Sequence, residues 1–329
     1  MGAINHQFAY KQETTYGTAV VVDTFLEFTS ETLRRQQNIG GSDGIRPSTR
    51  LGRGSTRRIT RNWAEGTVNF EVATEKFGRL FKVGLGAVST AQPEETNSPT
   101  VYLHTFTPGT LTGKSLTLQK GVEANDGTVF AFTYPGSKIS GFGFSQDPDG
   151  VLQMATDFLA RQEVSSTALA TANYSAPDVF HYAQGTVLID DVTNSNVISF
   201  SSVRYQNNFP IDRLFKLGNA GLMAEPLNRP RDTLGGTLRI EFEDRDDFYE
   251  AFAADTSVEI RLDFEGDAID DTYNNLLKLT IADARFTGET PQIPNTDVIV
   301  VDVPFTAWDP ASGDAFTIEY QNTESTYGA

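Results

Sequence analysis

The feature that most constrains this 329-residue chain is an internal duplication of architecture. The segment GTVNFEV at 66–72 alternates apolar and polar residues and precedes apolar residues at helical spacing, and GTLRIEF at 236–242 does the same. Such alternation predicts a half-buried strand, and the spacing that follows predicts an amphipathic helix. Similar lettering precedes each copy, with FTSETLRRQQN at 28–38 and FSSVRYQNN at 200–208. The chain is therefore predicted to hold two copies of one strand–loop–strand–helix–strand unit.

The duplication and the composition together predict a mainly β protein of two tandem domains. The length is sufficient for two domains that each bury a core, and the scattered Gly and Pro residues are typical of a turn-rich β protein. We place the first domain at 1–163 and the second at 179–329. Between them, the segment at 164–178 is small, polar and proline-containing, which is typical of a linker.

Local patterns predict the elements of each domain. In the first domain, Ala73 to Leu85 reads as a helix with Thr74 as its N-cap. Residues 36–58 are rich in Gly, Ser and Arg and show no periodicity, so we expect a long loop there, which is usually functional or disordered. Residues 86–100 are expected to form a polar loop. In the second domain, a helix is expected near 244–254.

Charge is distributed unevenly along the chain. The formal net charge of −17 argues against an ordinary nucleic-acid binder, because phosphate contacts need a basic surface. Residues 31–61 carry eight Arg against two acids, a net of +6, whereas residues 239–329 carry 21 acids against five bases, a net of −16. Two interpretations stay open: acidic surfaces that keep the protein soluble, and copies of the chain that stack through opposite charges.

The arginines of the basic segment are the candidate functional residues. The loop at 36–58 holds too few apolar residues to pack by itself, so it is either a mobile basic loop or a loop ordered by an acidic neighbouring subunit. We favour the second interpretation, because guanidinium groups pair well with carboxylates. The predicted inter-subunit contact residues are Arg34, Arg35, Arg46, Arg50, Arg53, Arg57, Arg58 and Arg61.

No motif predicts catalysis or nucleotide binding. The stretch GTLTGKS at 109–115 is one residue short of a phosphate-binding loop and leads into a strand pattern, so we predict a hairpin turn there. The histidines His6, His104 and His181 lack partners at ligand spacing, and we expect them in packing or surface positions. We therefore predict neither an enzyme nor a cofactor-binding protein.

Metal sites and membrane spans are not predicted either. Asp267, Asp270 and Asp271 lack the pattern of a calcium loop, so we expect a solvated turn, with an adventitious calcium ion as the minor alternative. The chain has no cysteine, which excludes disulfides and thiolate metal sites. No run approaches the roughly 18 apolar residues of a membrane helix, and the N-terminus lacks an apolar signal core. We expect a soluble intracellular product with no membrane partner.

Several segments together resemble the tail tube proteins of long-tailed, siphovirus-type viruses of prokaryotes, in a larger version with a duplicated domain. The resemblance extends from residue 8 almost to the C-terminus and rests on pattern and order more than on invariant letters. The segments that carry it are KQETTYGTAV, LEFTSETLRR, TRRITRNWAEGTVNFEV, EKFGRLFKVGLG, YLHTFTPG, PGSKISGFGFSQDPDGVLQMATDF and HYAQGTVLIDD.

The resemblance implies a fold and an assembly. Each domain is expected to have two packed antiparallel sheets, as a sandwich or barrel, flanked by one helix. Such domains join edge to edge into rings, their inner sheets merge into a barrel through which DNA passes, and the long loop reaches the adjacent ring. Because single-domain members form rings of six, two domains per chain predict three chains per ring, with six chains as the alternative.

The resemblance also implies partners and a location. The expected partners are further copies of the chain and the tape-measure, tail-terminator and baseplate proteins. The expected location is the virion tail, after assembly in the host cytoplasm.

Two carboxylates are candidates for the wall of the channel. A conduit that passes DNA without specific binding should repel phosphate. Glu71 and Glu241 occupy equivalent positions in the two copies and alternate with apolar neighbours, so they should face away from the core. Both the lumen and the outer wall are open to them, and we favour the lumen.

Other functions compete with the tube subunit. A tail terminator or a capsid-decorating protein would form a single ring or trimer instead of stacked rings. A carbohydrate- or receptor-binding β-domain would expose clustered aromatic side chains, and the only two tryptophans, Trp63 and Trp308, are weak support for that.

Overall fold

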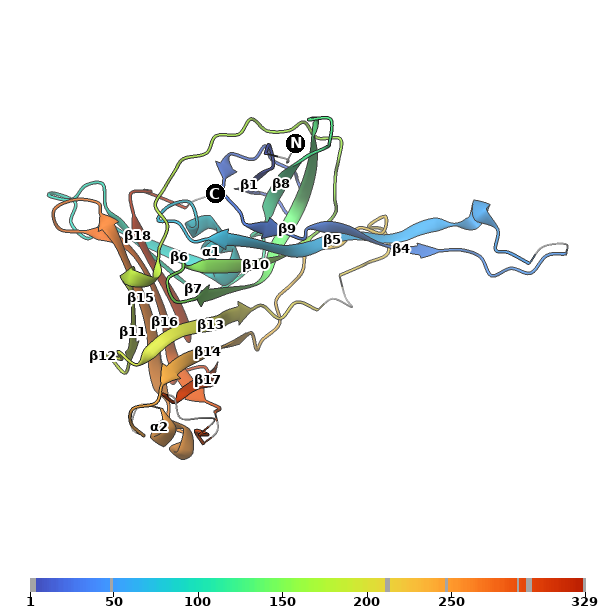
Figure 1. The fold of residues 1–329 in the computed structure, drawn as a ribbon. Coiled ribbons are helices and arrows are strands. Elements are labelled where there is room, and N and C mark those ends of the chain that lie inside the picture. The colour runs from blue at the N-terminus through green and yellow to red at the C-terminus, as the bar shows by residue number, and fades with distance from the viewer. Residues whose placement is uncertain are drawn as a thin grey trace.

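The fold is mainly β, as the sequence predicts. The computed structural model describes residues 4–47, 50–210, 214–245, 248–288, 290–293 and 298–327. Strands hold 48% of the chain and helices 6%, which confirms the predicted fold class. The strands pair antiparallel in one branched network (Figure 1).

The elements divide between the two halves of the chain. The strands of the first half are β1 (Gln7–Gln12), β2 (Thr24–Phe25), β3 (Ser30–Glu31), β4 (Arg34–Gly40), β5 (Arg58–Glu71), β6 (Gly86–Ala91), β7 (Tyr102–Pro108), β8 (Leu116–Glu123), β9 (Val129–Gln146) and β10 (Gln153–Ala160). Its helices are the 3-10 helix η1 (Gly54–Thr56) and α1 (Gly78–Leu85). The strands of the second half are β11 (Gly185–Ile189), β12 (Val192–Thr193), β13 (Val197–Gln206), β14 (Thr233–Glu241), β15 (Val258–Ala268), β16 (Asn274–Phe286), β17 (Val300–Ala307) and β18 (Phe316–Asn322). Its helices are η2 (Tyr182–Gln184) and α2 (Tyr249–Ala254).

Strand pairing repeats in the same order in both halves. The first half has the order β4–β5–β10–β9, and the second has β13–β14–β17–β16. The helices α1 and α2 each follow the second strand of their set. Strand β9 pairs with β13, which joins the two sets edge to edge into one sheet. We call this the joined sheet; in Figure 1 its strands run from β5, below β1 and β8, down to β17, above α2.

Side sheets branch from this joined sheet, again in repeated order. Strand β9 continues into the pairing β9–β8–β1–β2, and β16 continues into β16–β15–β11–β12. Strands β6 and β7 of the first half reach the second half through the β7–β18 pair, and β18 pairs with β16. The strand pairs β9–β13 and β7–β18 thus join the two halves to one another through backbone hydrogen bonds.

A bulge at the same place in both halves explains the repeated Gly-Thr dipeptide. Opposite Gly66, the partner strand is interrupted between β3 and β4, and opposite Gly236, β13 shifts its register. A Cβ atom on Gly66 would lie 2.5 Å from the Thr32 carbonyl oxygen, and one on Gly236 would lie 3.0 Å from the Val203 Cα. The bulged strand therefore approaches too closely for any side chain at these positions.

One hydrophobic core extends through both halves. Phe81 of α1 is fully buried, and its ring packs edge to face on Phe106 of the first half and Tyr320 of the second, at 5.6 Å in each case. The segment at 164–178 lies along the first half, where the Gln119 side chain is bonded to the backbone of Ala168 and Ala170. The domain boundaries at 163 and 179 stay a prediction.

The predicted loop at 36–58 is wrong at both ends. Residues 36–40 belong to β4, residue 58 begins β5, and η1 lies between them. The two strands form a ribbon that is exposed on both faces, with exposed or half-exposed side chains all along β4. Because neither face of the ribbon is buried, nothing requires apolar and polar residues to alternate along its strands, and the sequence shows no period of two.

Other differences concern element boundaries. Strand β9 is long and passes from a side sheet, where it pairs with β8, into the joined sheet, where it pairs with β10. Helix α1 begins at Gly78, so Thr74 is not its N-cap, and β6 occupies part of the loop expected at 86–100. Helix α2 begins five residues later than expected, and residues 246 and 247 lie outside the described part.

The turn at 109–115 joins β7 and β8, which pair with other strands, so the hairpin predicted there is wrong.

Candidate assembly surfaces

The basic segment forms a hairpin that projects from the body of the protein (Figure 1). We call residues 34–65 the arm. Its strands pair from Arg34 and Glu65 at the root to Gly40 and Arg58 below the tip. All eight predicted contact arginines are exposed, four in the strands and four at the tip. None forms an ion pair with a carboxylate among the described residues, which exclude 48 and 49 of the tip.

The root of the arm is braced by the long loop of the second half. Phe215 packs edge to face on Trp63 at 5.6 Å, and the Arg61 guanidinium lies 5.0 Å from the centre of the Phe215 ring. The Asn62 N–H donates to the Gly221 carbonyl oxygen at 2.8 Å. These contacts fix the direction in which the arm leaves the body, whereas the tip extends into solvent.

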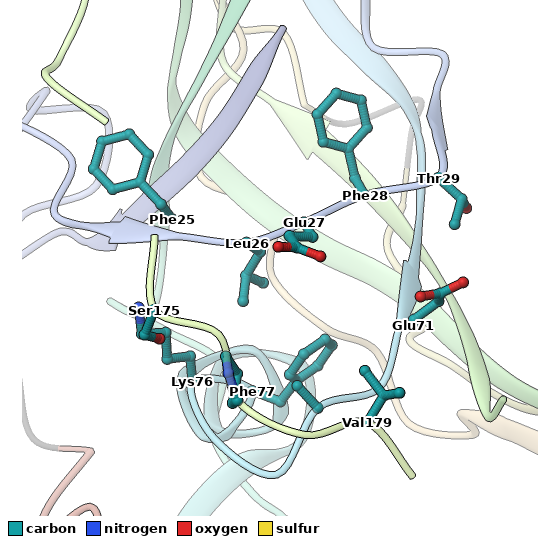
Figure 2. A pocket seen from close by; sticks show the side chains of 12 residues that line it. Phe25, Leu26, Glu27, Phe28, Thr29, Glu71, Lys76, Phe77, Ser175 and Val179 are labelled. Atoms are coloured by element: carbon teal, nitrogen blue, oxygen red, sulfur yellow. The ribbon is translucent and has the colours of Figure 1, made fainter. Parts of the chain in front are cut away.

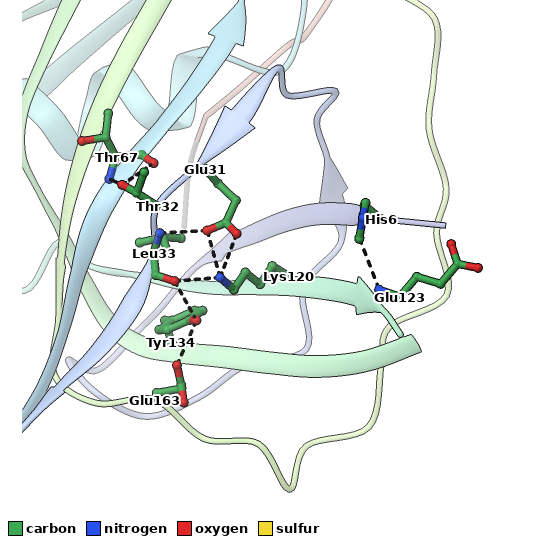
Figure 3. Close-up of polar contacts among 9 residues, drawn as sticks. All are labelled: His6, Glu31, Thr32, Leu33, Thr67, Lys120, Glu123, Tyr134 and Glu163. Atoms are coloured by element: carbon green, nitrogen blue, oxygen red, sulfur yellow. Dashed lines mark hydrogen bonds and ion pairs between the residues drawn. The ribbon is translucent and has the colours of Figure 1, made fainter. Parts of the chain in front are cut away.

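A polar network anchors the strand that leads into the arm (Figure 3). The Lys120 ammonium donates to both oxygens of Glu31 at 2.9 Å and to the Leu33 carbonyl oxygen at 2.7 Å. The Tyr134 hydroxyl donates to Glu163 at 3.0 Å, and its pKa is raised by burial and by this neighbouring carboxylate. The bulge between β3 and β4 is thereby held on the first half.

The joined sheet has one apolar and one polar face. Along β5, Val68 and Phe70 are fully buried, whereas Thr67 and Asn69 between them are not. We call the second face the polar face. Its polar residues on β5, β10, β14 and β17 are Glu65, Thr67, Asn69, Glu71, Gln153, Asp157, Thr237, Arg239, Glu241, Asp302 and Thr306.

An ion pair spans the junction of the two halves on this polar face. The Arg204 guanidinium of β13 crosses β9 and pairs with Asp157 of β10. Side chains are absent from β9 at the crossing, where Gly141 and Gly143 lie against Arg204. The second oxygen of Asp157 accepts a 2.6 Å hydrogen bond from the Thr67 hydroxyl. Four neighbouring strands are thus tied together across the β9–β13 junction.

The two predicted wall carboxylates lie at matching places. Glu71 and Glu241 are the last residues of β5 and β14; Glu71 is exposed and Glu241 half-buried. Figure 2 shows Glu71 beside a cavity of about 120 Å³, with Glu27 on the facing segment. Their equivalence in the fold supports the polar-face assignment, and their place in a lumen stays a prediction.

A buried ion pair that the sequence does not indicate joins the two halves. The Lys138 side chain is 1% exposed and its ammonium lies 2.6 Å from a Glu225 oxygen, which also accepts the Gly113 N–H at 2.6 Å. Burial lowers the pKa of Lys138, and Glu225 opposes that shift. Lys138 stands in an apolar strand pattern and its partner is 87 residues away, so no local pattern indicates the pair.

Removing one partner of this pair should destabilise the fold. We expect Glu225→Gln to lower the free energy of unfolding by about 3 kcal/mol, because Lys138 then stays buried without its counter-charge. Urea unfolding followed by circular dichroism measures the loss. As a control, Glu319→Gln breaks the partly exposed Lys278–Glu319 pair and should cost about 1 kcal/mol or less. Equal losses in the two variants would contradict the assignment.

The predicted histidine and aspartate positions have structural explanations. His104 is fully buried, 2.8 Å from the Thr90 hydroxyl and 2.7 Å from the Glu324 carbonyl oxygen, and burial lowers its pKa. Asp270 accepts two backbone N–H bonds at 2.9 Å, from Thr272 and Tyr273, which lowers its pKa and closes a turn. Among the described residues, no group of three or more His, Asp or Glu side chains is placed to hold a metal ion.

The chain is thus a mainly β protein with an exposed basic arm and a polar sheet face. Residues 3–307 match the family model of phage tail tube proteins, so the chain belongs to the phage tail tube protein family. No curated protein matches the chain significantly. In the described part of the chain, no helix is both long and apolar enough to cross a membrane. The protein is a structural subunit of the tail tube, a component of the virion tail that assembles with itself and other tail proteins.

Proposed function

We propose that three copies of this chain close one ring of the tube and that rings stack into a hollow conduit for DNA. The observation that carries this proposal is the repeated strand order joined through β9–β13. Each chain then supplies two equivalent four-stranded sets, and three chains supply six, a pseudo-sixfold ring. Ring closure also removes the free sheet edges that otherwise invite uncontrolled pairing.

The arm is the proposed contact between rings. It is long, exposed and basic, and its arginines have no carboxylate partner within the described part of the chain. Residues 239–329 carry a net charge of −16, so a neighbouring copy offers the complementary surface. The tip also exposes Ile45 and Leu51, at 102% and 83%, which a neighbour would cover.

The polar face of the joined sheet is the proposed wall of the lumen. It is turned away from the hydrophobic core, and the charge of Arg204 on it is balanced by Asp157. Glu71 and Glu241 add negative charge at equivalent places. On this face the acids Glu65, Glu71, Asp157, Glu241 and Asp302 outnumber the arginines Arg34, Arg204 and Arg239. The net negative charge of such a wall repels phosphate, so DNA passes without specific binding.

The remaining functional assignments follow from this role. The protein serves as a structural part of the conduit and is not an enzyme. It assembles in the host cytoplasm, and its further partners are the tape-measure, tail-terminator and baseplate proteins of a long-tailed virus.

Electron microscopy of the purified protein tests the proposal. We expect long hollow polymers whose reconstruction shows three chains per ring with pseudo-sixfold symmetry. Single rings that never stack would favour a terminator or decorating role instead. Six chains per ring would reject the trimeric ring and leave the duplication with another purpose.

A further inference from the structure

Arg34 of the first half stands in the same structural position as Arg204 of the second. Gly66 and Gly236 mark equivalent bulges, and the residue that precedes each glycine pairs with an arginine on the neighbouring strand. These pairs are Glu65 with Arg34 and Gly235 with Arg204. Both arginines therefore lie on the polar face, one residue beyond the bulge.

The two arginines differ in what they contact. Arg204 pairs with Asp157, two strands away, across the glycines of β9. Arg34 is exposed and forms no ion pair among the described residues, although Glu65 is its cross-strand neighbour. The Glu65 carboxylate instead accepts the Trp63 indole N–H at 3.2 Å. Arg34 thus occupies the position that corresponds to Arg204, which ties the two halves together, but within the described part of the chain it lacks an acidic partner like Asp157.

The outer edges of the joined sheet offer the missing junction. Within the described part of the chain, β4 pairs only with β5, so its other edge is free. At the far end, β15 pairs with β16 only as far as Ala284, so within the described residues Arg285 and Phe286 have a strand partner on one edge alone. The joined sheet ends in β4 on one side and in β16 on the other, and Figure 1 shows these strands far apart, so one copy cannot join its own edges.

An acid is available near the position that corresponds to Asp157. Asp157 pairs with Thr67, and the equivalent Thr237 pairs with Pro304. Asp302 lies two residues from Pro304 on the same face, a displacement of about 7 Å that an arginine side chain can cover. Asp302 is exposed and forms no ion pair among the described residues, although Arg239 is its cross-strand neighbour.

We propose that Arg34 of one copy clasps Asp302 of the next, across the end of β16, and so repeats between chains the Arg204–Asp157 clasp inside each chain. The inference rests on the proposed ring and identifies its closing contact. The partner is a second copy of this chain, joined through the edge of β4 and the β16–β17 end. The charge complementarity of the two residues and continuity with the internal β9–β13 junction support this choice.

Charge reversal tests the clasp. We expect Arg34→Asp and Asp302→Arg each to raise the protein concentration needed for tube assembly at least tenfold, because each places like charges at every junction between chains. The double variant should restore assembly to within about threefold of the natural protein, because the pair is reversed but attractive. Circular dichroism and thermal unfolding would verify that all variants are folded.

Matched controls separate the clasp from net charge. Lys216→Asp and Glu95→Arg make the same charge changes at exposed residues outside the arm, the polar face and residues 239–329, so both should assemble normally. Normal assembly of Arg34→Asp, or failure of the double variant to assemble, would overturn the clasp while the tube proposal stands. If the natural protein itself forms neither rings nor tubes, the proposed function fails.

Discussion

Replacing Arg50, Arg53, Arg57 and Arg58 together with alanine should leave a folded protein that polymerises poorly. All four side chains are exposed at or near the tip of the arm and touch no part of the hydrophobic core. An exposed ion pair contributes only about 0–1 kcal/mol, so one Arg→Ala change should have little effect. Four lost contacts per chain, repeated for every chain of a ring, should remove most of the attraction between rings.

The measurement compares tube length by electron microscopy with folding by circular dichroism. The matched control replaces the same four residues with lysine, which keeps the charge and gives up the bidentate guanidinium contact. We expect the lysine variant to form tubes and the alanine variant to remain as single rings or free chains. Tubes of natural length from the alanine variant would rule out the arm as the contact between rings.

Much of the fold could be predicted, because apolar and polar residues alternate along a half-buried strand, whereas apolar residues follow a helical spacing along an amphipathic helix. The segments at 66–72 and 236–242 bury every second side chain, and both became strands of the joined sheet. The same segments carry the Gly-Thr dipeptides that face the bulges. The sequence repeat therefore reflects the close approach of the neighbouring strand, which requires glycine in both halves. The family also could be recognised, because the order of these patterns extends along most of the chain.

The arm and the ties between halves could not be predicted for physical reasons. The arm strands are exposed on both faces, and their pairing depends on backbone hydrogen bonds that any residue can make. The β9–β13 pair and the Lys138–Glu225 pair are long-range contacts that no local period encodes. Arg204 is the exception, since its equivalence to Arg34 could have been found by aligning the two copies on their Gly-Thr dipeptides.

The single core predicts that the two halves unfold together. Phe81 is fully buried and touches aromatic rings from both halves, among them Phe144 and Tyr320. We expect Phe81→Ala to lower the free energy of unfolding by about 4 kcal/mol, because it leaves a large cavity among aromatic side chains that cannot move to fill it. The loss should appear in the second half as strongly as in the first, since the core is shared.

The two tryptophans allow two places in the fold to be observed separately. Trp63 lies on β5 against Phe215 of the second half, and Trp308 directly follows β17, so variants that keep only one of them, with phenylalanine at the other position, isolate each fluorescence signal. In both backgrounds we expect one urea transition at the same midpoint, and Phe81→Ala should move both midpoints equally. Phe130→Ala is the matched control, because Phe130 is 54% exposed and its loss should cost less than about 1 kcal/mol. If Phe81→Ala moved only the Trp63 transition, the halves would be independent domains, and the pairing of β9 with β13 would be too weak to make them one cooperative unit.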